Sequence, residues 1–315
     1  MRLAFVFPGQ GSQKTGMGAD LCEGYKQARE VFDEASETLG FDVARLCWSG
    51  PAQELDLTVN TQPCLLTASV AVFRVLAAEG VQPSFVAGHS LGEYTAAVVA
   101  GALDFRAALK ITRRRAELMQ EAVPAGAGMM AAILGLSGSV VDEICSGVKT
   151  GYVRAANYNC PGQVVVSGET EAVREAMRLA VEKGAKAIPL KVSVPSHSAL
   201  MEGAAGKLAE FFISSGVRIN PPSIALVSNA DARAVSGAEE LEDALIRQLS
   251  NPVRWEESLE AVRAAGADAF IEAGPGKVLC GLIKRTLPDA AFFNVEDRAS
   301  LQNTLRALRA SEQGG

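Results

Sequence analysis

Short apolar runs alternate with longer segments of helical periodicity along most of this chain, and this alternation limits the possible folds more than any other feature. The short runs suit buried strands, and the longer segments suit helices that cover them. A chain with this order of elements builds a largely parallel sheet with helices on its faces, so the sequence predicts an α/β fold. Outside the middle of the chain, we predict strands at residues 3–7, 85–87, 224–228, 269–272 and 291–295, and helices at 25–39, 62–79, 105–123, 197–215, 238–249, 252–265, 278–287 and 300–310, with a further helix from Leu91.

The middle of the chain has a different order of elements. The pattern is β-α-β-β-α-β, the ferredoxin-like unit, with strands at 129–136, 152–158, 163–167 and 186–192 and helices at 139–148 and 169–183. We therefore expect a small subdomain, residues 128–192, inserted into a large subdomain that residues 1–127 and 193–315 form. Glycine-rich residues 124–128 and the pair Val194 and Pro195 are the expected hinges.

Composition argues against several classes of function. The 315 residues carry a net charge of −6 with no long run of either sign, which disfavours nucleic acid or an anionic membrane as the main partner. The six cysteines are scattered, and with only two histidines no zinc-ligand pattern can be written. The N-terminal apolar run is too short for a signal peptide. We expect a cytoplasmic protein with reduced thiols and no bound metal.

One serine has the surroundings of a nucleophile. Ser90 lies in a G-x-S-x-G motif between a predicted strand and a predicted helix, and Gly88 and Gly92 leave room for the sharp turn that such a serine needs. A serine hydroxyl attacks only when a base accepts its proton, and histidine is the usual base. Because His89 is the immediate neighbour of Ser90, their side chains should diverge. His197 is therefore the candidate base, while a chance occurrence of the motif remains the alternative.

Arg115 is the second informative residue. On the helix predicted at 105–123, it falls near the middle of the apolar stripe, whereas Arg113 lies opposite and Arg114 lies at the edge. A buried guanidinium needs an anion, because a lone buried charge is very costly. The partner is either an acidic side chain of the protein itself, or carbonyl groups, or the carboxylate of a substrate held by a bidentate clamp.

Two further features are less specific. The loop at 8–13 is rich in glycine but lacks the lysine of a P-loop, so we interpret it as a donor of backbone N–H groups to an oxyanion hole, or else as an ordinary turn. No acidic residue has a motif that marks it as the third member of a triad. Asp231 is conceivable, and a backbone carbonyl could orient His197 instead.

With these motifs, the chain resembles the malonyl-CoA:acyl carrier protein transacylases of fatty-acid synthesis and, more widely, the acyltransferase domains of polyketide synthases. The resemblance covers nearly the whole chain. It implies an α/β-hydrolase-like subdomain with a mainly parallel sheet and a ferredoxin-like insertion. It rests on FPGQGSQ at 7–13, GHSLGEY at 88–94, the arginine at 115, GAGMMAAI at 126–133, NYNCPGQVVVSG at 157–168, VPSHSALM at 194–201, QLSNPVRW at 248–255 and EAGPGK at 272–277.

The resemblance implies a reaction and assigns residues to it. A malonyl group would pass from malonyl-CoA to Ser90, with His197 as base, and then to the phosphopantetheine thiol of acyl carrier protein. No cofactor is expected, because the phosphopantetheine belongs to the partner. The remaining implied roles are oxyanion-hole amides for Gln10 and Leu91, carboxylate binding for Arg115, orientation of His197 by the Gln248 carbonyl, a place in the active site for Asn159, and contact with the acyl group for Met119.

Two alternatives stay open from the sequence. A serine hydrolase could use the same serine and histidine, although it would need neither a carboxylate clamp nor a carrier-docking cleft. A non-catalytic carrier-binding protein could keep the fold, although intact Ser90, His197 and Arg115 argue against it. The carrier is acidic, so we also expect a basic patch near the cleft, and we expect the protein to be a monomer. Candidates for the patch are Lys186, Lys191, Lys284 and Arg285.

Overall fold

Two five-stranded sheets form the framework of the computed structural model, which describes residues 1–124, 126–190, 192 and 194–313. The first sheet has the order β10-β9-β1-β2-β7, and every neighbouring pair is parallel. This confirms the predicted α/β class. The strands are β1 (Leu3–Phe7), β2 (Phe85–Gly88), β7 (Ala225–Val227), β9 (Ala269–Ala273) and β10 (Ala291–Val295).

Helices cover both faces of the first sheet, as the alternation of side chains along its central strand requires. Phe5 and Phe7 point into the larger apolar core, whereas Ala4 and Val6 point into a smaller core on the opposite face. The smaller core is closed by α12 (Trp255–Ala264) and α13 (Val278–Thr286). The larger core is closed by α1 (Ala19–Gly24), α2 (Lys26–Leu39), α3 (Val43–Ser49), α4 (Ala52–Leu55), α5 (Thr58–Ala78), α6 (Gly92–Val99), α7 (Phe105–Glu121), α10 (Glu202–Ser215), α11 (Ala238–Arg247) and α14 (Arg298–Gln313).

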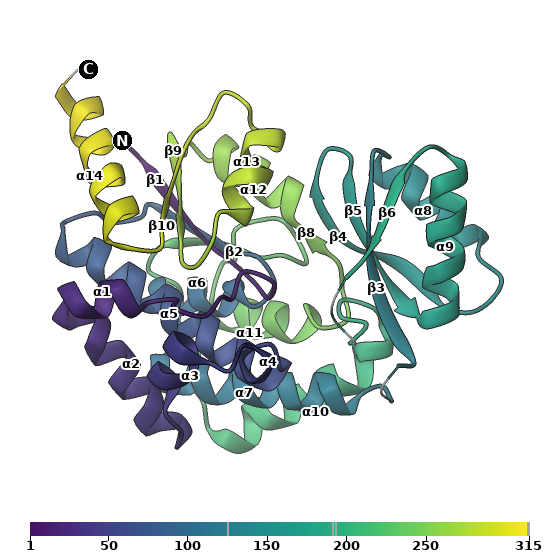
Figure 1. Ribbon diagram of the computed structural model, residues 1–315, viewed down its shortest axis with the longest axis horizontal. Helices are drawn as coiled ribbons and strands as arrows, with labels where there is room; N and C mark the ends of the chain where they lie inside the picture. Colours follow the sequence, from purple (N-terminus) through teal and green to yellow (C-terminus); the bar gives the residue numbers. More distant parts are fainter. Residues whose placement is uncertain (125, 191, 193, 314–315) are drawn as a thin grey trace.

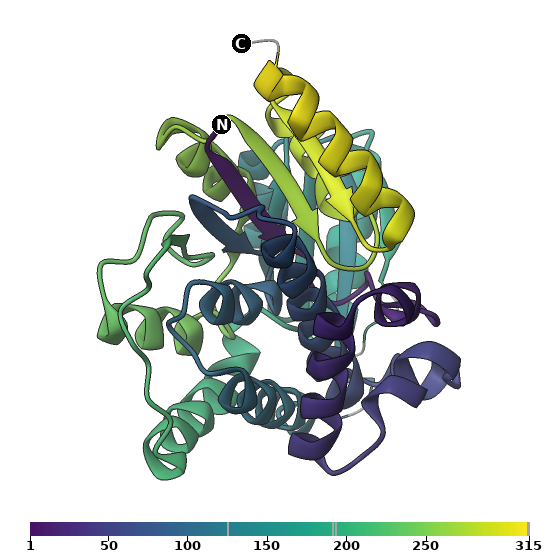
Figure 2. The same cartoon turned by 90° about the vertical axis from the view of Figure 1, so that its left-hand side faces the viewer.

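The second sheet has the order β6-β3-β5-β4-β8, and its first four strands are antiparallel neighbours. With α8 (Gly138–Gly147) and α9 (Thr170–Glu182) on one face, these four strands form the predicted ferredoxin-like unit, which lies to one side of the first sheet in Figure 1 and behind it in Figure 2. The four strands are β3 (Gly128–Leu134), β4 (Val153–Cys160), β5 (Gln163–Glu169) and β6 (Lys186–Pro189).

A strand from the large part of the chain extends the second sheet. β8 (Val253–Arg254) pairs in parallel with β4, so the sheet continues across the junction between the two parts (Figure 1). The chain crosses between the parts where Gly128 packs against Pro195: a Cβ atom on Gly128 would lie 2.4 Å from the proline ring. The subdomain limits at 127/128 and 192/193 stay a prediction.

Several predicted elements need correction. The helix predicted at 252–265 begins only at Trp255, because Val253 and Arg254 pair with β4. The helix predicted at 197–215 starts later, since a short 3₁₀ turn (Ala199–Met201) precedes α10 and His197 lies in the preceding loop. β6 ends at Pro189 rather than at residue 192, and Lys191 lies outside the described residues. Sequence reasoning also missed α1, α3 and α4, which are too short for a clear helical period.

The longest apolar helix belongs to the core. By length and composition α5 could cross a membrane, but 78% of its most apolar window is buried inside the protein. The six cysteines, at 22, 47, 64, 145, 160 and 280, are all buried and unpaired in the described part of the chain, as predicted.

Candidate active site

Ser90 occupies a strained turn between β2 and α6. Its φ of 51° lies in the left-handed region, which non-glycine residues adopt at a cost of about 1–3 kcal/mol. The two glycines of the motif make the turn possible. A Cβ on Gly88 would lie 1.9 Å from the Gly92 carbonyl carbon, and a Cβ on Gly92 would lie 2.1 Å from the Phe7 carbonyl oxygen. The predicted elbow therefore forms, and it presents the serine side chain at the carboxyl end of the sheet.

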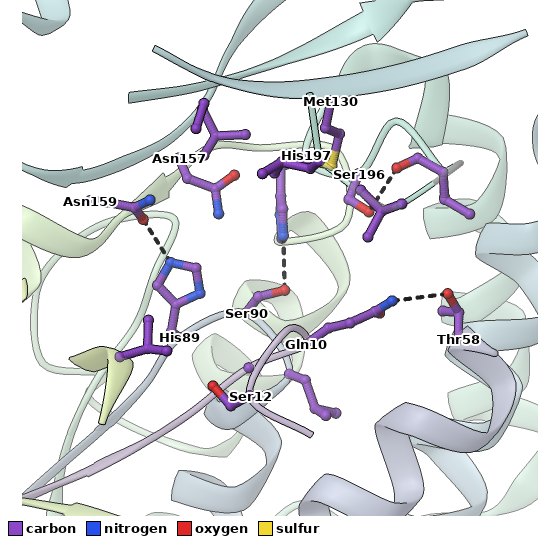
Figure 3. A pocket seen from close by; sticks show the side chains of 18 of the residues that line it. Gln10, Ser12, Thr58, His89, Ser90, Met130, Asn157, Asn159, Ser196 and His197 are labelled. Carbon is purple, nitrogen blue, oxygen red and sulfur yellow. Dashed lines mark hydrogen bonds between the residues drawn. The ribbon is translucent and has the colours of Figure 1, made fainter. Parts of the chain in front are cut away.

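The predicted base meets this serine. The Ser90 Oγ and His197 Nε2 atoms are 2.8 Å apart, although the residues are separated by 107 positions (Figure 3). His197 is itself held in the left-handed region, with φ 60°. Its Nδ1 donates to the Gln248 carbonyl oxygen at 2.8 Å, and its backbone N–H donates to the Leu249 carbonyl oxygen at 2.9 Å. Both ring nitrogens are thus engaged, and the imidazole has a fixed orientation.

The end of α11 supplies the carbonyl that orients the histidine. The helix stops at Arg247, so the Gln248 carbonyl has no helical partner and is available to His197. Asp231, the acidic alternative considered above, instead forms an ion pair with Arg247 at 2.8 Å. The third position beside the serine and histidine is therefore a main-chain oxygen.

Arg115 is buried beside the serine, and only 1% of its surface is exposed. Its Nη1 donates to Gln62 Oε1 at 2.7 Å, and its Nη2 donates to Gln248 Oε1 at 2.9 Å and to Ser90 Oγ at 3.3 Å. Within the described residues it pairs with no carboxylate, whereas the neighbouring Arg114 forms ion pairs on the surface. The charge of Arg115 therefore faces neutral acceptors.

Burial and this cation control the protonation of the site. Burial, and then the positive charge of Arg115, lower the pKa of His197 to about 3. Burial also lowers the pKa of His89 and of the Arg115 guanidinium itself. At neutral pH His197 is consequently an uncharged imidazole, whose Nε2 can accept the proton of the Ser90 hydroxyl.

These groups open into a cavity of about 230 Å³ between the two sheets. One wall is the face of the small sheet that α8 and α9 leave uncovered, and the opposite wall carries the serine and α13. Asn159 and Met119 line the cavity as expected; Asn159 Oδ1 is 2.8 Å from His89 Nε2 (Figure 3), and the Met119 sulfur accepts a hydrogen bond from Gln62. The apolar lining comes from Met130, Ala132, Val165, Leu190, Val192, Val194, Val278, Leu279 and Leu282.

Two backbone amides of residues that line the cavity have no hydrogen-bond partner among the described residues. In the part of the chain that the structure describes, the N–H groups of Gln10 and Leu91 donate no hydrogen bond, and both residues line the cavity. The Ser90 N–H, by contrast, is engaged by Asn229 Oδ1 at 2.7 Å. The two free amides have the chemistry of an oxyanion hole.

Sequence reasoning missed several polar residues of the site. Gln62, Glu93 and Asn229 are buried around the elbow, and Asn157 lines the cavity. The available signals were a glutamine inside an apolar helix before Pro63, and a glutamate in a helix whose other residues are buried. Of the proposed basic patch, Lys186, Lys284 and Arg285 are exposed, and Arg285 also donates to the Pro161 carbonyl and to Gln163. Among the described residues, no cluster of side chains could hold a metal ion.

Together these features define a class of α/β protein, in which a serine on a strand-to-helix turn is hydrogen-bonded to a histidine over a cavity. The chain belongs to the acyl transferase domain family, whose model matches residues 4–306. It is 48% identical over 303 residues to the malonyl CoA-acyl carrier protein transacylase of Haemophilus influenzae, covering 95% of this chain and 96% of that protein. It is 45% identical to the transacylase of the same name from Bacillus subtilis, covering 98% of both chains.

Solved structures agree with this assignment. An acyl carrier protein S-malonyltransferase from Vibrio cholerae superposes with a TM-score of 0.93 at 47% identity, covering 96% of this chain and all of that one. A malonyl-transacylase in complex with the acyl carrier protein of a type II polyketide synthase superposes with a TM-score of 0.94 at 46% identity, covering 98% and 100%. The family resemblance predicted from the motifs is confirmed.

Proposed function

We propose that this protein transfers the malonyl group of malonyl-CoA to the phosphopantetheine thiol of acyl carrier protein, in fatty-acid synthesis. One observation carries the proposal: the Ser90 hydroxyl, 2.8 Å from a neutral His197, shares its cavity with an arginine that lacks a carboxylate partner among the described residues. The names of the relatives support the choice of malonyl, and the solved complex supports the choice of partner.

In the first half-reaction, the Ser90 oxygen attacks the thioester carbonyl of malonyl-CoA while His197 Nε2 takes the hydroxyl proton. The carbonyl oxygen becomes an oxyanion, which the N–H groups of Gln10 and Leu91 stabilise. When the C–S bond breaks, the imidazolium returns the proton to the thiolate, and coenzyme A leaves as the thiol. The Gln248 carbonyl stabilises the imidazolium through Nδ1.

In the second half-reaction, the phosphopantetheine thiol gives its proton to His197 and attacks the malonyl ester of Ser90. The same two amides stabilise the second oxyanion, and the serine leaves with the proton that the histidine holds. The apolar cavity wall from the small sheet and α13 would accommodate the pantetheine arm and limit access of water to the ester.

Arg115 selects the acyl group. Its guanidinium would hold the free carboxylate of malonyl in a bidentate pair, with Met119 against the chain between the two carbonyl groups. An acyl group without a carboxylate offers the buried guanidinium no anion within hydrogen-bond distance, which is unfavourable relative to malonyl. Asn159 keeps the His89 ring in place through the hydrogen bond at 2.8 Å.

Intact-mass spectrometry tests the function directly. The wild-type protein should gain the mass of one malonyl group from malonyl-CoA and much less from acetyl-CoA, and holo acyl carrier protein should remove it and become malonylated. Ser90→Ala should gain nothing. Ser12→Ala is the matched control, because Ser12 lines the same cavity and is not paired with His197. Malonylated Ser90→Ala protein would contradict the nucleophile, and loss of the adduct to water regardless of carrier would favour a hydrolase.

The setting of the reaction is also part of the proposal. We expect a cytoplasmic monomer that needs no cofactor of its own and binds an acidic carrier. Exposed Lys186 begins β6, the strand that leads to the cavity-lining Leu190, and exposed Lys284 lies in α13, whose Leu279 and Leu282 line the cavity. Both lysines would face that carrier.

A further inference from the structure

The mechanism above leaves one buried titratable group beside the site without a role. Glu93, in the first turn of α6, has no exposed surface. Its Oε2 accepts hydrogen bonds from Gln248 Nε2 at 2.5 Å and from the Asn229 N–H at 3.3 Å. Its Oε1 is equally buried and accepts none from the described residues. A carboxyl group with one idle buried oxygen needs an explanation.

The Gln248 side chain connects this carboxyl group to Arg115. The amide of Gln248 donates from Nε2 to Glu93 and accepts on Oε1 from Arg115 Nη2 at 2.9 Å. It therefore lies between a buried carboxyl group and a buried cation, and its amide dipole is oriented to interact favourably with both. Nε2 also donates to the Ser90 carbonyl oxygen at 2.9 Å, which fixes the amide in this orientation.

Few other charges act on Glu93. Asp231 opposes the ionisation of Glu93, but the Asp231 charge is compensated by Arg247 at 2.8 Å. Tyr94 follows Glu93 in the same helix, and because its pKa is raised it carries no charge near neutral pH. The buried side chains of α5, β1 and β2 that pack around α6 are uncharged. Arg115 is thus the main favourable charge for an ionised Glu93, and its influence reaches the carboxyl group through Gln248.

We propose that Glu93 is the internal counter-ion of Arg115 in the empty site, and that it takes up a proton when the carboxylate of malonyl-CoA binds Arg115. Once the substrate carboxylate neutralises the guanidinium, an ionised Glu93 is left in a buried site without a cation. One proton from solvent converts it to the neutral acid. The proton goes to Oε1, so both hydrogen bonds to Oε2 persist. This proposal rests on the proposed binding of malonyl by Arg115.

Burial supports this exchange, because it raises the pKa of Glu93 to about 7 in the empty protein. The group is therefore close to equal populations of its two forms near neutral pH, where loss of the Arg115 charge shifts the balance toward the acid. Uptake of a proton on binding means that affinity for malonyl-CoA falls as pH rises, by up to about tenfold per unit above the pKa. Acetyl-CoA has no carboxylate and should not show this component.

Titration calorimetry on the Ser90→Ala protein tests the proposal without turnover. Malonyl-CoA and acetyl-CoA are titrated at about pH 8 in two buffers of different ionisation enthalpy, which gives the number of protons taken up with each ligand. We expect malonyl-CoA binding to take up close to one proton more than acetyl-CoA binding. The difference should vanish in Ser90→Ala/Glu93→Gln, in which the amide keeps an acceptor for Gln248 but cannot titrate.

Ser90→Ala/Glu272→Gln is the matched control. Glu272 is equally buried and its pKa is also raised, but it accepts from the amides of Leu279 and Cys280 rather than from the Arg115 network. This variant should retain the extra proton. Equal uptake with both ligands, or a difference that persists with Gln at 93, would overturn the proposal.

The pH dependence of the malonyl-to-acetyl affinity ratio in Ser90→Ala keeps the test valid if a glutamate variant fails to fold. A ratio that does not change with pH would also overturn the proposal. If the ratio does not change with pH but the wild-type serine still gains a malonyl adduct, the proton uptake by Glu93 is refuted and the proposed function stands. Failure of the proton uptake and failure of the proposed function are therefore distinguishable.

Discussion

Replacement of Arg115 by alanine should separate two substrates that differ by one carboxylate. In the proposed complex, the guanidinium donates two charge-assisted hydrogen bonds to malonyl, each worth about 1.5–3 kcal/mol. The side chain is 1% exposed, so solvent screening does not reduce these values much. The loss is then about 3–6 kcal/mol, or about two to four orders of magnitude in kcat/KM for acylation by malonyl-CoA.

The rate of acylation by acetyl-CoA measures the indirect effects of the same substitution on the site. Alanine at 115 leaves Gln62 and Gln248 without the donors that they have at 2.7 and 2.9 Å, and the Gln248 carbonyl orients His197. Any resulting displacement of the histidine affects both substrates alike. Because the variant also removes a cation that acetyl cannot pair, we expect acylation by acetyl-CoA to change by no more than about tenfold.

Single-turnover acylation, followed by intact mass after rapid quench, gives both rate constants. Arg114→Ala is the control, because Arg114 is the adjacent arginine of α7 and its ion pairs with Glu117 and Glu121 lie on the surface. It should leave both rates within a factor of about two to three, as expected for exposed ion pairs. Equal loss of acylation by malonyl-CoA and acetyl-CoA in Arg115→Ala would refute the clamp and leave Arg115 a structural residue.

Two further predictions concern stability. Gly92→Ala should lower the free energy of unfolding, measured in urea, by about 1–3 kcal/mol, because the new Cβ would lie 2.1 Å from the Phe7 carbonyl oxygen. Gly206→Ala is the control and should not destabilise the protein, because a Cβ at this position of α10 meets open space. Equal stability of the two variants would contradict the packing at the elbow. Burial raises the pKa of Glu93 from its ordinary value of 4.5 to about 7, so the stability it contributes below pH 4.5 is lost as pH rises to 7. Glu93→Gln should therefore gain about 3 kcal/mol relative to wild type between pH 4.5 and pH 8 in urea unfolding, and parallel pH curves would contradict the raised pKa.

The sequence identified residues that the structure brings together where residue type and spacing carry the information. Ser90 has a motif whose glycines are required by contacts of about 2 Å, and His197 followed by elimination because the chain has two histidines. Arg115 followed from its place in an apolar stripe, and it is buried as that place required. In each case the signal was a residue type that is energetically costly or unusual in its local surroundings.

The sequence predicted less where tertiary contacts determine the structure of a segment or the partner of a side chain. The partner of His197 is a main-chain carbonyl, which any residue at 248 would supply, so only the family resemblance pointed to it. β8 has only two residues, and it forms because they pair with the edge of β4. From the sequence alone these two residues continue the helical pattern of the segment that follows, so they were predicted as helix. Gln62 and Glu93 have no clear sequence signal, because one polar residue inside an apolar helix is commonly satisfied by local contacts. Their connection to Arg115 depends on tertiary contacts.

In the proposed function, the presence of glutamine rather than glutamate around Arg115 would let the site be both stable and selective. A carboxylate at 62 or 248 would satisfy the guanidinium internally, and a malonyl group would then have to displace it. The neutral oxygens of Gln62 and Gln248 hold the guanidinium in place at 2.7 and 2.9 Å without cancelling its charge. The counter-charge lies one amide further away, on Glu93, where we propose that it offsets part of the Arg115 charge in the empty site and is neutralised by a proton when the substrate binds. Under the proposed function, the cost of a buried cation with no anion in direct contact is thereby converted into discrimination between acyl groups.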